Sequence, residues 1–518
     1  MHSRALGKLL VGNMLVTAAT RFPNRTAFVC VTSGRRMTFR KTNERCNRLA
    51  SGLLARGFRK GDVIGFLCSN RAEMPEIYFA LAKTGIIGIP LNYRLASAEV
   101  VELLKSMGAR GLIYEYRFAE CALEVRNKFP EVTHFVSIGD EAPSVGIGYE
   151  GLLAASSDAE PATEIDEADP FYFNLTSGTT GLPKAYILTQ FNNAVAGQFG
   201  PAFDITSGDV VMTTFPMFGR VGVAWMLCSI IHGLPNVLVN FEPAAVLQAI
   251  ATERVTIVNL VSTMAVMLMA DDKLSRSDLG SLRAIVFAGA MLPAPIREQT
   301  AAKLCSNIYE YYGMQESGML VHSTPEDRVM RPDSVGRVSL FAEIRIVGAD
   351  GESLPAGEIG EIIGRSPGAV TEYFDNPEKS AETFRDGWVH TGDLGSLDAE
   401  GFLFIRGRKK DMIITGGQNV HSAEVEEILV AHPDVADVGV IGLADELWGE
   451  QVCAVIVPRA GVAPDPEDLT AFCKARLAGF KTPKQFFLQS DPLPRTPTGK
   501  IQKFLLVERY QHRDGGSA

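Results

Sequence analysis

The sequence predicts an α/β protein of two domains. A large N-terminal domain of layered, mostly parallel sheets carries a small antiparallel β unit, and a small α+β domain follows it. Strand-like runs alternate with helical patterns up to about residue 335, where hairpin turns begin to appear. A charged stretch at residues 406–411, followed by two glycines, indicates a boundary. We therefore expect domains at residues 1–409 and 410–518.

The N-terminal domain is predicted to begin with a helix. The apolar run "LLVGNMLVTAA" is interrupted by Gly12 and Asn13, which favours a helix over a signal peptide. Strand and helix then alternate, as in "DVIGFLCS" before "EMPEIYFALAKTG" and "LRAIVFAGA" before "PIREQTAAKLC". The later stretch "EIRIVGADGESLPAGEIGEIIGR" reads as antiparallel hairpins. Other apolar stretches are too short for a bilayer of about 30 Å, so we expect no transmembrane segment.

The net charge bears on the kind of partner, and the cysteine content bears on the compartment. The net charge of −10 argues against a nucleic-acid-binding protein, which normally carries a basic domain. Residues 471–518 are locally basic. This basic segment is explained equally well by a solvated surface or by a surface that binds an anionic partner. The eight cysteines show no regular spacing, which favours reduced thiols in a cytoplasmic protein.

The stretch "TSGTTGLPKA", residues 176–185, follows a predicted strand. Its glycines and hydroxyls cannot build a core, but they can present N–H and O–H groups to a polyphosphate, with Lys184 beside it. The loop is not a Walker P-loop, because the G-x-x-x-x-G-K-[ST] spacing is absent and a strand, not a helix, is predicted to follow. Phosphate binding is the favoured interpretation over a plain turn.

This loop and four later motifs resemble the adenylate-forming superfamily, which includes acyl- and aryl-CoA synthetases, luciferases and peptide-synthetase adenylation domains. The later motifs are "YYGMQESG", "WVHTGDLG", "GRKKDMIITGGQNV" and "PRTPTGK", and they stand in the order of that family. They extend from Thr176 to Lys500. The chain is therefore identified as a member of this superfamily.

The resemblance implies a site for ATP and AMP. In it, Tyr312 would stack on adenine, Asp393 and Arg408 would reach the ribose, and Glu316 with Thr176 would hold Mg²⁺ through hard oxygen ligands. The nucleotide-binding residues that it implies are Thr176, Ser177, Gly178, Thr179, Thr180, Gly181, Lys184, Gly289, Ala290, Tyr312, Gly313, Asp393, Arg408 and Lys500.

The family's first half-reaction joins a carboxylic acid to ATP. The carboxylate attacks the α-phosphorus and expels pyrophosphate, so catalysis depends on positioning and on stabilising charge at the phosphate oxygens. The resemblance implies that Lys500, Lys184 and Gln315 do this here. Lys500 lies in the turn-like sequence "PTGK", from which it can reach a site on the other domain.

The second half-reaction would transfer the acyl group to coenzyme A and release AMP. In this family the C-terminal domain rotates about a hinge, and Lys410 aligns with that hinge. The rotation would bring Gly416 and Gly417 beside the pantetheine arm, where adjacent glycines permit close backbone approach.

Four residues depart from the common family pattern. They are Ala185, Gln190, Gly219 in place of a histidine, and Gln315 in place of a threonine. The Gln315 amide can still donate a hydrogen bond, and Gly219 leaves room for a bulkier acid. The implied acyl pocket consists of Phe218, Gly219, Val221, Ala288 and Gly313.

The sequence thus predicts an AMP-forming acyl- or aryl-CoA ligase that uses ATP, Mg²⁺ and coenzyme A, with a homodimer as one possible assembly. One alternative is a nucleotide-binding regulator that has lost turnover. Another is a ligase for a dicarboxylic acid, with Arg220 on the second carboxylate, although we expect Arg220 to be exposed or to extend its charged end to solvent.

Overall fold

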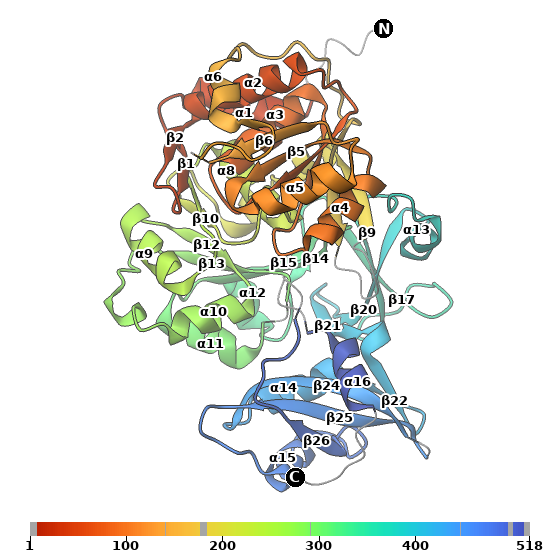
Figure 1. Ribbon diagram of the computed structural model, residues 1–518. Helices are drawn as coiled ribbons and strands as arrows, with labels where there is room; N and C mark the ends of the chain where they lie inside the picture. Colours follow the sequence, from red (N-terminus) through yellow and green to blue (C-terminus); the bar gives the residue numbers. More distant parts are fainter. Residues whose placement is uncertain are drawn as a thin grey trace.

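The computed structural model describes residues 8–139, 141–176, 184–290, 292–445, 447–495 and 501–511. Two large sheets with their helices form the upper part of the molecule, a third sheet lies beside them, and a fourth forms the C-terminal part at the lower end (Figure 1). The predicted α/β class is confirmed. Ser177, Gly178, Thr179, Thr180, Gly181 and Lys500 lie outside the described residues.

The first sheet has seven strands in the order β7-β6-β5-β3-β4-β8-β9, all parallel except β9, which pairs antiparallel with β8. Its strands are β3 (Val63–Leu67), β4 (Ile87–Pro90), β5 (Ala109–Glu115), β6 (His134–Ile138), β7 (Ile147–Gly148), β8 (Pro170–Thr176) and β9 (Lys184–Thr189). The helices between them are α3 (Glu73–Thr84), α4 (Ser97–Ser106), α5 (Ala119–Lys128) and α6 (Tyr149–Ala154), and α2 (Phe39–Ala55) precedes them. The strand predicted to follow the glycine-rich loop is β9, which confirms that the loop does not open into a helix.

The second sheet has nine strands in the order β16-β15-β14-β13-β12-β10-β11-β1-β2. Its strands are β1 (Thr26–Cys30), β2 (Arg36–Thr38), β10 (Val211–Thr213), β11 (Asn236–Leu238), β12 (Ile257–Leu260), β13 (Ala284–Phe287), β14 (Ile308–Met314), β15 (Gly318–Ser323) and β16 (Arg337–Val338). Its helices are α1 (Val11–Arg21), α7 (Gln190–Ala196), α8 (Arg220–His232), α9 (Pro243–Glu253), α10 (Ser262–Ala270), α11 (Ala294–Lys303) and α12 (Pro325–Met330). The predicted N-terminal helix is α1.

The core between these two sheets is filled by helices α3 and α8. Every residue of α3 is buried, and Ile77 and Tyr78 share one apolar cluster with Met226 and Leu227 of α8. The Tyr78 hydroxyl donates a hydrogen bond to the Met217 carbonyl at 2.7 Å, just before α8. This packing fixes the start of α8 relative to the first sheet, and the candidate site lies there.

The third sheet is antiparallel, as predicted from the hairpin turns. It contains β17 (Glu343–Val347), β18 (Gly360–Arg365), β19 (Phe384–Arg385), β20 (Trp388–Leu397) and β21 (Leu403–Arg408), with α13 (Pro377–Thr383) before β19. Strand β20 lies between β18 and β21 and is the longest strand of this sheet. Residues near the middle of β20, among them Asp393, are buried.

The C-terminal sheet has its own apolar clusters. It contains β22 (Met412–Thr415), β23 (Gln418–His421), β24 (Val435–Asp445), β25 (Gly449–Pro458) and β26 (Gln485–Leu488), with helices α14 (Ser422–Val430), α15 (Pro466–Lys474) and α16 (Lys503–Tyr510). The turn Lys409–Asp411 separates β21, the last strand of the third sheet, from β22. A domain boundary at Lys410 stays a prediction.

Two further features bear on the predicted class. No helix within the described ranges has both the length and the apolar character required to cross a bilayer. All eight cysteines fall within the described part of the chain, and all are free thiols.

Candidate active site

A cavity of about 2,430 Å³ lies where the two large sheets, the antiparallel sheet and the C-terminal sheet meet. Its lining includes Thr176 at the end of β8, the turn after β14, and Asp393 on β20. From the C-terminal part it includes Ser422 at the start of α14, and Lys503. Segments far apart in the sequence therefore enclose one space.

One end of the cavity combines a cation, a carboxylate and hydroxyls. The Lys184 ammonium lies 4.9 Å from the ring centre of Tyr373, and the Tyr373 hydroxyl donates to Glu316 Oε1 at 2.8 Å. Glu316 is buried, and burial together with this carboxylate raises the pKa of Tyr373. Thr176 donates from Oγ1 to the Lys184 carbonyl at 3.4 Å. This end suits a phosphate chain.

The same end has the donor set that a magnesium ion requires. Glu316 and Thr176 both line the cavity and offer a carboxylate and a hydroxyl oxygen, which are hard ligands. Only one oxygen of Glu316, Oε1, receives the Tyr373 hydrogen bond. The residues present therefore fit Mg²⁺.

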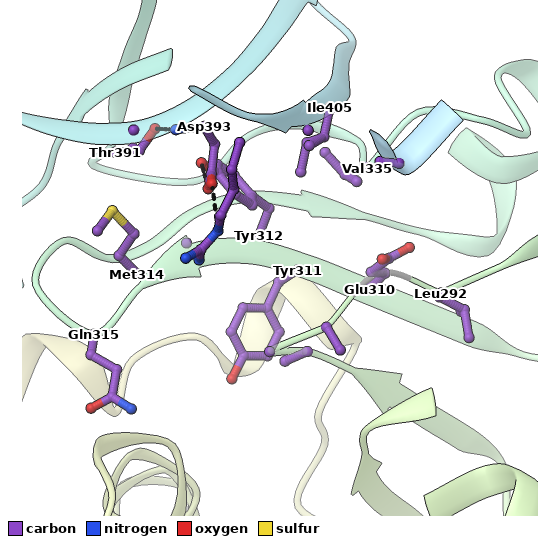
Figure 2. A pocket seen from close by; sticks show the side chains of 18 of the residues that line it. Leu292, Glu310, Tyr311, Tyr312, Met314, Gln315, Val335, Thr391, Asp393 and Ile405 are labelled. Atoms are coloured by element: carbon purple, nitrogen blue, oxygen red, sulfur yellow. Dashed lines mark hydrogen bonds and ion pairs between the residues drawn. The ribbon is translucent and has the colours of Figure 1, made fainter. Parts of the chain in front are cut away.

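Asp393, Tyr312 and Arg408 form a second polar group on an adjoining wall. Tyr312 and Asp393 lie close together on this wall (Figure 2). The Tyr312 hydroxyl donates to Asp393 Oδ2 at 2.8 Å, and Arg408 Nε lies 3.2 Å from Asp393 Oδ1. Strand pairing sets this geometry, because Asp393 on β20 lies opposite Arg408 on β21. Burial and the neighbouring Asp393 carboxylate raise the pKa of Tyr312. Carboxylate and guanidinium together can bind vicinal hydroxyls.

Two glycines, Gly289 and Gly313, lie on the next wall of the cavity, each at a position that requires glycine. Gly289 has a φ of +80° and lines the cavity with Ala290. Gly313 needs to be glycine for a different reason, since a Cβ there would lie 2.0 Å from the Gly318 carbonyl oxygen. Both positions bring the backbone close to the cavity, as the nucleotide-binding prediction requires.

An apolar wall adjoins these polar walls. It is backed by a buried cluster of Phe215, Val261 and Ala288, against which Val221, Met264 and Tyr311 pack, and of these six residues Phe215, Val221, Ala288 and Tyr311 line the cavity. The predicted pocket residues Phe218, Gly219, Val221, Ala288 and Gly313 all line the same cavity. A Cβ on Gly219 would make only ordinary contact, at 3.5 Å from the Pro216 carbonyl oxygen, so a side chain can be added at this position without a clash at its Cβ.

Several site residues escaped the sequence analysis. Tyr311 points to the opposite side from Tyr312 (Figure 2), as consecutive strand residues do, and this alternation could have indicated its place in the pocket. Phe215, Val261 and Met264 carry no such signal, because each reads as an ordinary core residue.

Two predicted features are not brought to the cavity. Gly416 and Gly417, with φ of +55° and +77°, are exposed at the turn between β22 and β23 and do not belong to the cavity lining. The Gly416 N–H donates to the Trp448 carbonyl at 2.8 Å. The hinge candidate Lys410, in contrast, lines the cavity.

The expectation for Arg220 is wrong. Its side chain is buried, with 5% of the residue exposed, and both Nη groups donate to backbone carbonyls, of Gln315 and Gly368. Helix α8 starts at Arg220, and burial of α8 against α3 draws the side chain inward.

Comparison with known proteins places these features in a family. The family model for AMP-binding enzymes matches residues 15–374, and that for the AMP-binding enzyme C-terminal domain matches residues 424–500. A long-chain-fatty-acid–CoA ligase, FadD13 of Mycobacterium tuberculosis, is 33% identical over 96% of this chain and 98% of its own length. A feruloyl-CoA synthase of Amycolatopsis sp is 34% identical, over 96% and 99%. The anthranilate CoA ligase AuaEII, solved with anthranoyl-AMP, superposes with a TM-score of 0.91 at 28% identity over 98% and 99%.

Proposed function

The chain belongs to the family of AMP-binding enzymes and is an AMP-forming acyl- or aryl-CoA ligase, and we propose that its acid is an apolar monocarboxylic acid with an aromatic or aliphatic body. One observation carries the proposal. The apolar side chains of Phe215, Val221 and Ala288 form a pocket in the wall of the same cavity that Lys184 and Glu316 line. An acid held in that pocket would present its carboxylate to the phosphate end.

The first half-reaction follows from this placement. A carboxylate oxygen attacks the α-phosphorus of ATP, the bond to the β-phosphate oxygen breaks, and pyrophosphate leaves with the electron pair. We assign Lys184, Lys500 and the Gln315 amide to the phosphate oxygens, where fixed positive charge and hydrogen-bond donors stabilise the transition state. Mg²⁺ on Glu316 and Thr176 would neutralise part of the triphosphate charge.

We assign the nucleotide to the polar wall described above. Asp393 and Arg408 would bind the ribose hydroxyls and Tyr312 the adenine ring, after Asp393 exchanges its present Tyr312 and Arg408 contacts for ribose. The backbone at Gly289 and Ala290, which line the cavity, would lie against the adenine, and we assign Ser177, Gly178, Thr179, Thr180 and Gly181 to the phosphates.

The second half-reaction needs another arrangement of the C-terminal part. The thiolate of coenzyme A attacks the acyl carbonyl, the acyl–phosphate bond breaks, and AMP leaves. Because Gly416 and Gly417 do not line the cavity here, we propose that the structure represents the adenylating arrangement and that rotation at Lys410 delivers these glycines. The same proposal takes residues 1–409 and 410–518 as the two domains.

The acid class is tested by a panel of short fatty, medium-chain, cyclohexane-type, cinnamate-type and dicarboxylic acids. Acid-dependent pyrophosphate–ATP exchange reports the first step, and coenzyme A-dependent AMP release reports the second. We expect turnover with apolar monocarboxylic acids in the presence of magnesium. A preference for a dicarboxylic acid would contradict the acid assignment, and tight ATP binding without turnover on any acid would favour the regulator alternative.

Gly219→His is expected to narrow the acid range. Because Gly219 lines the cavity and tolerates a Cβ, an imidazole there would occupy room that the bound acid needs, and kcat/KM for ring-containing acids should fall about tenfold or more, as steric exclusion from a pocket typically does. Butyrate, which needs less room, should lose less. Steady-state kinetics on both acids measure the difference.

A matched control is Gly151→His, at an exposed helix position where a Cβ meets nothing within 4 Å. It should leave both acids unaffected. Equal losses on large and small acids in Gly219→His would contradict the pocket assignment.

The cysteines bear on where the protein works. The free thiols suit a reducing compartment, so we propose the cytoplasm. A homodimer stays a prediction, which sedimentation velocity of the purified protein tests.

A further inference from the structure

Gln315 is held at both of its oxygen atoms. Its backbone carbonyl accepts from the Tyr186 hydroxyl at 2.7 Å and from the Arg220 guanidinium, and its side-chain Oε1 accepts from Asn174 Nδ2 at 2.5 Å. With both oxygens engaged as acceptors, the amide NH₂ is the group left to donate. Gln315 lines the cavity, and Figure 2 shows its side chain apart from the Asp393 group.

The residues that hold Gln315 are themselves rigid. Asn174 and Tyr186 are fully buried and lie opposite each other on β8 and β9, and Asn174 Nδ2 also lies 2.6 Å from the Tyr186 hydroxyl. Buried strand pairs have little freedom, so the position of the Gln315 side chain is set by the first sheet.

Arg220 ties the same turn to a second loop. One Nη group donates to the Gln315 carbonyl and the other to the Gly368 carbonyl. Two further contacts close this junction, from the Val370 N–H to the Glu316 carbonyl at 2.9 Å and from Ser366 Oγ to the Ser317 carbonyl at 2.7 Å. The turn that carries Gln315 and Glu316 is thus fixed from two sides.

Arginine suits this task better than other residues. A guanidinium is a rigid fork whose separate N–H groups reach two acceptors at once, and its charge strengthens each bond. A lysine can supply the charge but only one compact donor group. Arg220 uses its fork on two carbonyls of different loops, and this leaves it poorly placed to bind a second substrate carboxylate.

We propose that Arg220 and Asn174 are positioning residues for the first half-reaction: they orient Gln315, through its carbonyl and its side-chain oxygen, so that its NH₂ donates to the α-phosphate as charge develops there. The proposal rests on the adenylating function proposed above. Asn174 does not line the cavity, and Arg220, which does, has both Nη groups on backbone carbonyls. Both act through the placement of Gln315 and, for Arg220, of the adjacent Glu316.

The test uses the full-length protein and the best acid of the panel. Arg220→Met is expected to lower kcat of pyrophosphate exchange by about 10- to 100-fold, the usual result of a misplaced catalytic group. The KM values for acid and ATP should change little. Thioester formation from supplied acyl-adenylate and coenzyme A should be much less affected, since the thiolate attacks the acyl carbon in that step and the α-phosphorus keeps its four oxygens. Arg220→Lys should recover part of the loss.

Arg45→Met is the control for losing a largely buried arginine, because Arg45 pairs with Glu76 and Glu150 and does not line the cavity. It should reduce thermal stability and leave the exchange kinetics of the folded protein unchanged. Equal losses in both half-reactions for Arg220→Met, or exchange kinetics no different from those of Arg45→Met, would overturn the proposal. If Arg220→Met does not fold, Arg220→Lys and Asn174→Ala supply the same comparison.

A double-mutant cycle separates positioning from general damage. Asn174→Ala should lower kcat of exchange in the wild-type background but have little further effect in Gln315→Ala, because its partner is then gone. Independent, multiplicative losses would overturn the role of Asn174. Absence of exchange in the wild type would instead contradict the proposed function, so the two failures are distinguishable.

Discussion

Lys500→Ala is expected to lower acid-dependent pyrophosphate exchange by about 100- to 1,000-fold, the scale found when one preorganised charge or donor is removed from a transition state. Thioester formation from supplied acyl-adenylate should persist, because the second step does not expel pyrophosphate. Exchange of labelled pyrophosphate into ATP and AMP release from the adenylate measure the two steps separately.

The described residues that flank this segment support the prediction. Arg495 and Ile501 form an antiparallel bridge, and both line the cavity together with Gln502 and Lys503. Lys474→Ala, at the end of α15 and outside the cavity, is the matched control and should retain both activities. Loss of both half-reactions in Lys500→Ala would contradict the two arrangements proposed for the C-terminal part.

The polar half of the candidate site could be predicted because its residues lie in short motifs. Asp393, Arg408 and Glu316 each belong to a distinctive run of sequence, and strand pairing then brings Asp393 and Arg408 together. Their chemistry is also specific, since a buried carboxylate or cation needs a partner.

The apolar half could not be predicted to the same degree. Phe215 follows β10, whereas Val261 and Met264 follow β12, and only the strand order of the second sheet makes them neighbours. Apolar residues at strand ends are also normal in any core, so no local pattern separates a pocket wall from packing. The same holds for Asn174 and Tyr186, whose polar groups are hidden inside a run that reads as a buried strand.

The order of the strands within each sheet could not be predicted from the sequence pattern. The alternation of strands and helices predicts parallel sheets, but β1 and β2 join the far edge of the second sheet beside β11, across more than 200 intervening residues. Such pairings depend on long-range packing of α1 and α8 against the first sheet, which periodicity does not encode. The correction for Arg220 has the same origin, because burial of α8 places a charged residue in the interior.

Glu316→Gln is expected to lower pyrophosphate exchange about 100-fold at saturating acid and to raise the magnesium concentration needed for half-maximal rate. The amide keeps the size of the side chain but removes the negative charge that a hard divalent cation requires. Removal of the metal from the wild type with EDTA should abolish exchange, and added Mg²⁺ should restore it. Magnesium titrations of both proteins provide the comparison.

Tyr373→Phe is the informative partner of this variant. It removes the hydroxyl that donates to Glu316 Oε1 and leaves the carboxylate charge in place, so exchange should fall only a few-fold. The magnesium requirement should then stay close to that of the wild type, because orientation rather than charge has been lost. An unchanged magnesium requirement in Glu316→Gln itself would show that this carboxylate does not hold the metal. In that case Thr176, the other oxygen donor assigned to the ion, would be the next ligand to test by mutation.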